Sequence, residues 1–70
     1  MMETIELIQT ENFNTFVLPD EYKGYTILDV LANGSLFPHG TWNLLDSKDA
    51  IILNYSFEQG AKIEAQVRKD

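Results

Sequence analysis

A chain of 70 residues has room for one hydrophobic core, so we expect a single domain over residues 1–70. A core of this size supplies only about 3–5 kcal/mol without a further constraint, and the absence of cysteine excludes both a disulfide and a cysteine-based zinc site. The formal net charge of −6 argues against direct binding to nucleic acid or to an anionic membrane, because both attract basic surfaces.

The first half of the chain predicts three strands. Residues 3–9 alternate apolar and polar side chains, with Ile8 out of phase. Residues 13–18 are rich in aromatic and β-branched side chains, so they form a second strand or continue the first one past a bulge. Pro19-Asp20-Glu21 ends this region and also fits a short helical turn. Residues 25–32 carry apolar side chains on both faces, which is typical of a central strand or of one covered on both sides.

Turn signals organise the middle of the chain. Asn33-Gly34 predicts a type I′ hairpin turn, because both central residues of that turn need a positive φ. The return strand, residues 35–45, is interrupted by Pro38-His39-Gly40. Since a proline cannot donate to a strand ladder, this stretch is an edge, a bulge or a loop. Residues 46–49 have the composition of a further turn.

The last third of the chain predicts a final hairpin. Residues 50–57 and 63–68 both alternate with a period of two, and a turn at residues 58–60 joins them. One face of this hairpin is expected to be buried and consists of Ile51, Leu53, Tyr55, Phe57, Ile63, Ala65 and Val67. The last strand is expected to be an exposed edge, because it carries the charges that protect such an edge: Lys62, Arg68 and Lys69.

Together these elements predict an all-β fold: an antiparallel meander of five or six short strands, in a curled sheet or a small barrel. A core this small gains stability by burial against a partner, so a homo-oligomer paired through an edge strand stays an alternative to a monomer. The first ten residues lack the basic and apolar regions of a signal peptide, and the absence of cysteine fits a reducing compartment. A cytoplasmic location is therefore expected.

No constellation of residues predicts catalysis. His39 is the one histidine, but no serine lies in a nucleophile motif such as G-x-S-x-G that it would activate. Asp46-x-x-Asp49 lacks the glycine and the terminal glutamate of a calcium loop. We therefore expect no catalytic residue, no metal site and no cofactor, and a protein that is not an enzyme.

The acidity is concentrated in the first half of the chain. Six acidic residues and one lysine give residues 1–35 a net charge of −5, which leaves −1 for residues 36–70. This charge serves solubility, and it also attracts basic proteins. The first hypothesis is a small acidic, non-enzymatic protein that binds and occludes a partner protein with a basic surface, as phage-type inhibitors of nucleic-acid-binding proteins do. The residues expected to contact that partner are Glu3, Glu6, Glu11, Asp20, Glu21 and Tyr22.

An alternative hypothesis uses the aromatic residues in the middle of the chain. Phe37, His39 and Trp42 would then form a face that binds a sugar or an apolar ligand. The single tryptophan has two interpretations, since it either fills the core or anchors a ligand or partner at the surface. The sequence leaves both open.

Overall fold

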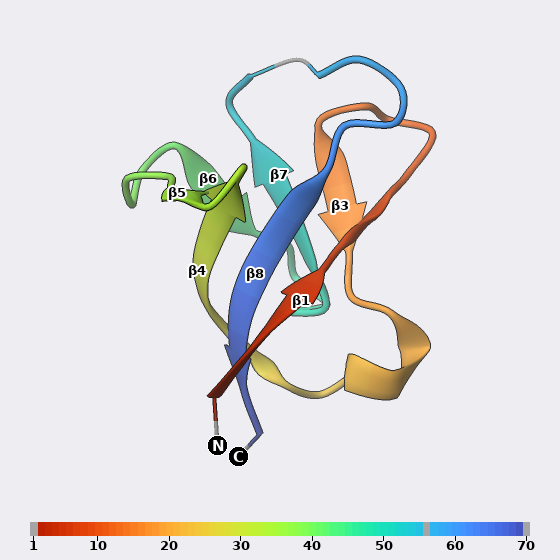
Figure 1. The fold of residues 1–70 in the computed structure, drawn as a ribbon. Helices are drawn as coiled ribbons and strands as arrows, with labels where there is room; N and C mark the ends of the chain where they lie inside the picture. Colours follow the sequence, from red (N-terminus) through yellow and green to blue (C-terminus); the bar gives the residue numbers. More distant parts are fainter. Residues whose placement is uncertain (1, 56, 70) are drawn as a thin grey trace.

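The computed structural model describes residues 2–55 and 57–69, and the described part of the chain is all-β, as predicted. It contains two antiparallel sheets of four strands each, in the orders β1-β8-β4-β5 and β2-β3-β7-β6 (Figure 1). The strands are β1 (Met2–Glu6), β2 (Ile8–Gln9), β3 (Thr15–Val17), β4 (Thr26–Ala32), β5 (Ser35–Leu36), β6 (Trp42–Leu44), β7 (Ala50–Leu53) and β8 (Ile63–Arg68). A 3₁₀ helix, η1 (Asp20–Tyr22), directly follows Pro19, at the place where the sequence predicts a short helical turn.

A bent strand joins the two sheets on one side of the molecule. β1 pairs with β8, the N–H of Leu7 still donates to the carbonyl of Ile63 at 2.9 Å, and β2 then pairs with β3. We call residues 2–9 the corner strand. On the opposite side, β5 ends one sheet and β6 ends the other, and the two strands do not pair with each other. The fold is therefore open along this side, which we call the open seam.

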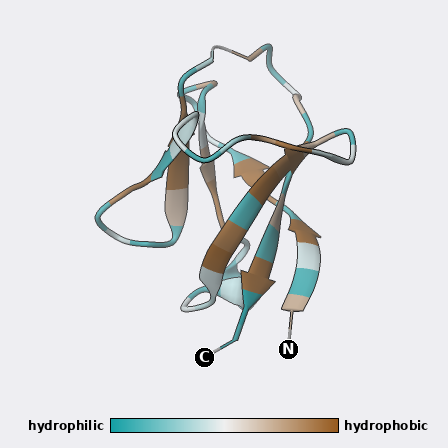
Figure 2. Cartoon of the chain, turned by 90° about the vertical axis from the view of Figure 1, so that its left-hand side faces the viewer, coloured by the Kyte–Doolittle hydropathy of each residue, from teal (hydrophilic) through white to brown (hydrophobic). Residues whose placement is uncertain are grey.

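The core lies between the two sheets. Along the strands, hydrophobic and hydrophilic residues alternate (Figure 2), and the hydrophobic set of each sheet faces the other sheet. The largest fully buried side chains are Phe16, Leu18, Val30, Ile51, Leu53, Ile63 and Val67. The predicted burial of Ile51 and Leu53 on one strand, and of Ile63, Ala65 and Val67 on the other, is confirmed.

A bulge explains why the sequence of β4 is apolar on both faces. The register against β8 shifts between Ile27 and Asp29, which leaves Leu28 as the extra residue. Ile27 and Val30 therefore both face the core although they are three residues apart. The predicted central position of this strand is confirmed, since β4 lies between β8 and β5. Its apolar pattern reflects a change of phase within the strand.

The Asn33-Gly34 turn is confirmed as predicted. Asn33 has φ 53° and Gly34 has φ 81°, and the turn pairs Ala32 with Ser35. Both central residues have the positive φ of a type I′ turn, whose twist matches that of the flanking strands. The predicted edge character of the return segment is also confirmed, because β5 and β6 each end a sheet.

The predicted meander and its final hairpin are wrong. There are eight strands in the described residues where five or six were expected, and β7 and β8 belong to different sheets. β7 ends at Leu53, so Tyr55 lies outside it and is half exposed, while Ser56 falls outside the described residues. Contrary to the prediction, β8 is an interior strand with β1 and β4 as neighbours. A period of two sets which face is buried, but it carries no information about which strand lies alongside.

Candidate functional site

The six acidic and aromatic residues expected to bind a partner are spread along one side of the molecule. Glu3 and Glu6 lie on β1, and Asp20, Glu21 and Tyr22 form η1 at one end of the corner strand. Glu11 lies in the loop of residues 10–14 at the other end (Figure 1). All five carboxylates are exposed, and Tyr22 is partly buried against the core. The fold therefore brings Glu3 together with η1 and places Glu11 apart from them.

Glu3 and Tyr22 interact electrostatically on this side of the molecule. The negative charge of Glu3 raises the pKa of the Tyr22 phenol, and burial, a hydrogen bond with Glu3 and the charge of Glu21 act in the same direction. The ring of Tyr22 also meets the ring of Tyr25 edge-to-face, with the centroids 5.1 Å apart. We call Glu3, Asp20, Glu21, Tyr22 and Tyr25 the tyrosine end of the corner strand.

Removing the Glu3 charge is expected to lower the pKa of Tyr22 toward its ordinary value. The folded state holds the neutral phenol, so its contribution to stability is complete below about pH 10 and is lost as pH rises through the raised pKa. In Glu3→Gln this contribution should be smaller, and its loss should be complete at a lower pH than in the parent protein. An NMR titration of the Tyr22 ring measures the shift, and Glu58→Gln, which makes the same charge change in the β7–β8 loop, should leave the Tyr22 titration unchanged.

The corner strand exposes apolar side chains between its carboxylates. Among the described residues, six large hydrophobic side chains are exposed, and three of them lie in the first 13 residues: Met2, Ile8 and Phe13, which are 59%, 52% and 45% exposed. Ile8 is the residue that is out of phase in the sequence pattern, and this was the available signal for an exposed apolar position. We call the set Met2, Glu6, Ile8, Glu11 and Phe13 the corner strip.

Carboxylates also meet across the strands beside this strip. Glu6 pairs in register with Glu64 of β8. Like charges directly opposite each other in an antiparallel pair repel, so this position costs stability in the isolated domain. A cation brought to this face would relieve that repulsion.

The residues expected to form a ligand face lie over the open seam. Phe37 and Trp42 are partly buried and pack against the core, and the Phe37 ring lies 6.3 Å from that of Phe57. The N–H of Phe37 donates to the carbonyl of Val30 at 2.8 Å, which ties the segment after β5 back to β4.

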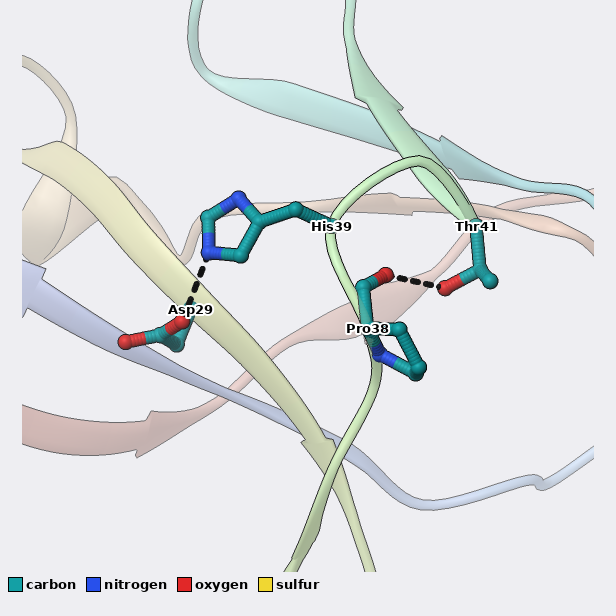
Figure 3. A network of polar contacts seen from close by, with 4 residues as sticks. All are labelled: Asp29, Pro38, His39 and Thr41. Carbon is teal, nitrogen blue, oxygen red and sulfur yellow. Dashed lines mark hydrogen bonds and ion pairs between the residues drawn. The ribbon is translucent and has the colours of Figure 1, made fainter.

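His39 connects the same loop to β4 by its side chain. Its Nε2 lies 3.0 Å from Oδ1 of Asp29, and the hydroxyl of Thr41 donates to the carbonyl of Pro38 at 2.6 Å (Figure 3). The His39 side chain is 72% exposed, so its ion pair with Asp29, present when His39 is protonated, contributes little. The His39 ring also lies 5.5 Å from that of Trp42. The loop is thus held over the seam by polar contacts on its outer side and by aromatic packing beneath.

Two open clefts lie elsewhere on the surface, and neither is lined by Phe37, His39 or Trp42. One, of about 340 Å³, lies between residues 24–27 and the turn that precedes β7. The other, of about 570 Å³, lies between the loop of residues 10–14 and residues 59–60, and it includes Glu11 and Phe13 of the corner strip. Of the residues predicted to bind a partner, Glu11 is thus the one that lines either of these two clefts.

The described residues contain no group of three or more His, Cys, Asp or Glu side chains arranged to hold a metal ion. In that part of the chain no helix has both the length and the apolar character needed to cross a membrane. Comparisons of the sequence with protein-family models and with curated proteins, and of the structure with solved structures, found no match.

Proposed function

We propose that this protein is a non-enzymatic binding protein that occludes a basic surface of a partner protein through its corner strand. The observation that carries the proposal is the combination of carboxylates and exposed apolar side chains on the corner strip. Carboxylates alone serve solubility, whereas the exposure of the apolar side chains of Met2, Ile8 and Phe13 to water is unfavourable in free energy. A complementary partner surface therefore has positive charges around an apolar patch.

The two kinds of side chain have different roles in such a complex. Glu3, Glu6 and Glu11 attract the basic partner before contact and orient it, which raises the association rate. Ile8 and Phe13 bury apolar surface on contact and stabilise the complex once it has formed, so they lower the dissociation rate. Tyr22 offers an aromatic contact at the tyrosine end, beside the carboxylate of Glu3, which raises the pKa of its phenol.

Charge reversal tests the electrostatic part of the proposal. With the partner identified by pull-down, Glu3→Lys/Glu6→Lys/Glu11→Lys should slow association by about tenfold or more at low salt, because steering contributes factors of this order. The parent protein should itself associate more slowly as salt rises, since charges are screened beyond about 8 Å at physiological ionic strength. Stopped-flow or surface-based kinetics at two salt concentrations measure both effects.

A matched pair of single variants provides the control. Glu6→Lys changes the corner strip, and Asp46→Lys makes the same change at an exposed position of the β6–β7 turn. Only the first should slow association, and Ile8→Ala should instead raise the dissociation rate by roughly tenfold. Equal effects of the two lysine variants, or association that ignores salt, would show that the corner strip does not steer the partner.

A second candidate function is supported by one observation at the open seam. Nε1 of Trp42 is buried and has no hydrogen-bond acceptor among the described residues. A buried donor without an acceptor is rare. A sugar hydroxyl that reached it beside His39 and Phe37 would satisfy this donor. Saturable quenching of Trp42 fluorescence by a sugar or an apolar ligand would favour this alternative, and an unchanged spectrum across a panel of such ligands would remove it.

A further inference from the structure

The larger cleft is formed by two loops that are far apart in the sequence. It has a volume of about 570 Å³ and is lined by Gln9, Thr10, Glu11, Phe13, Gln59 and Gly60. The two loops that supply this lining lie at the end of the corner strand away from the tyrosine end (Figure 1).

The side chain of Gln9 holds the two walls of this cleft together. Its Nε2 donates to the carbonyl of Phe13 and to that of Glu58, both at 3.0 Å, and its Oε1 accepts the N–H of Gly60 at 2.8 Å. These bonds use both donors of the amide and tie the 10–14 loop to the 58–60 loop. The walls are therefore positioned before any ligand arrives, which lowers the entropy lost on binding.

The hydroxyl of Thr10, a second polar group of the cleft wall, is also engaged in hydrogen bonds within the protein. The hydroxyl of Thr10 lies 3.0 Å from the carbonyls of Asn12 and Thr15 and accepts the N–H of Asn12 at 3.2 Å. What remains for a ligand is the exposed carboxylate of Glu11, the exposed ring of Phe13 and the amide of Gln59. The lining contains no basic residue.

A carboxylate and an exposed aromatic ring that line the same cleft favour a cation, and the chemistry of the two groups favours a planar one. A guanidinium can pair with a carboxylate through two parallel hydrogen bonds and can stack on an aromatic face, whereas an ammonium is a compact and strongly hydrated charge. We propose that this cleft receives an arginine side chain of the partner protein, between Glu11 and the ring of Phe13. This inference rests on the proposed function for the existence of a basic partner, and it names the residue of that partner that the cleft recognises.

The test uses a small probe in place of the partner. N-acetyl-L-arginine amide is titrated into the ¹⁵N-labelled protein, and N-acetyl-L-citrulline amide serves as a neutral probe of nearly the same shape. The arginine probe should cause saturable shifts at the amides of Glu11, Phe13 and Gly60, with a dissociation constant on the order of millimolar, which is typical of a single small contact. The citrulline probe should bind at least about tenfold more weakly, because it cannot form a charged pair.

Three variants locate the binding. Glu11→Gln and Phe13→Ala should each weaken the arginine probe several-fold, while Glu58→Gln, in the opposite loop and outside the lining, should have little effect. All three positions are exposed, so the variants should keep the parent's spectrum away from the cleft. Equal binding of the citrulline probe, or equal loss in Glu58→Gln, would overturn the inference.

The outcome is separable from that of the proposed function. If the arginine probe does not bind while Glu6→Lys still slows association with the partner, the cleft does not recognise arginine and the corner strip still binds the partner. If the probe binds and association with the partner ignores both salt and Glu6→Lys, the cleft inference stands for the isolated protein and the steering role of the strip fails.

Discussion

Replacing Leu53 or Ile63 by alanine is expected to bring the domain close to unfolding. Both side chains are 1% exposed, Leu53 on the inner face of one sheet and Ile63 on the inner face of the other. Truncation of a buried leucine or isoleucine costs about 2–5 kcal/mol, because the lost apolar contact is combined with a cavity that closes only in part. A core of this size supplies only about 3–5 kcal/mol in total, so either change removes most of it.

Urea denaturation followed by circular dichroism measures this loss. Leu44→Ala is the matched control, because Leu44 lies on β6, in the same sheet as Leu53, and its side chain is 41% exposed. That variant should change the free energy of unfolding by less than about 1 kcal/mol, as is usual for exposed positions. If Leu53→Ala and Ile63→Ala unfold at the same urea concentration as Leu44→Ala, the two sheets do not enclose the core described for this fold.

Changes at Trp42 are expected to separate its packing from its hydrogen bonding. Trp42→Ala should destabilise the domain by about 3 kcal/mol, toward the low end for a tryptophan, because the side chain is only partly buried. Trp42→Phe keeps an aromatic ring over the seam and removes the indole N–H that has no acceptor among the described residues. An unsatisfied buried donor costs about 1–3 kcal/mol, which offsets the lost contact area. Trp42→Phe should therefore remain within about 1 kcal/mol of the parent protein.

The same urea experiment distinguishes the two interpretations of this tryptophan. A parent-like midpoint for Trp42→Ala would mean that the side chain is a surface anchor that adds nothing to the core. A loss in Trp42→Phe as large as that in Trp42→Ala would mean that the indole N–H makes a hydrogen bond that stabilises the fold.

Local signals in the sequence were sufficient for the turns and the buried faces. Asn33-Gly34 specifies its turn through residues that tolerate a positive φ, and the alternation along residues 63–67 identifies the buried face of β8. The partner of β8 could not be inferred in this way. Its neighbours β1 and β4 are distant in sequence, and their pairing depends on how the whole chain turns between the sheets. The bulge at Leu28 could not be inferred either: one extra residue reverses the phase of all that follow, and the sequence then shows only apolar side chains on both faces.

The candidate site likewise has one part that the sequence predicts and one part that it does not. Its carboxylates were visible in the sequence as an excess of charge in the first half of the chain. The cleft was not visible, because it exists only where residues 9–13 meet residues 58–60 through the side chain of Gln9. The sequence marks neither Gln9 nor Phe13 as more than part of a strand. Their role follows from tertiary contacts that no local pattern encodes.

The interior position of β8 has a consequence for the order in which the chain can fold. Strands β3, β7 and β6 pair with one another without it, whereas β1 and β4 gain their central neighbour only when β8 is in place. The pairing of Glu3 with Val67 closes a loop over nearly the whole chain. Such closure costs conformational entropy before the contacts that it allows stabilise the fold. Folding rates fall as contacts become less local. The sheet that carries most of the corner strand should therefore form last. Until it does, the residues of the corner strip have no fixed arrangement in which to contact a partner.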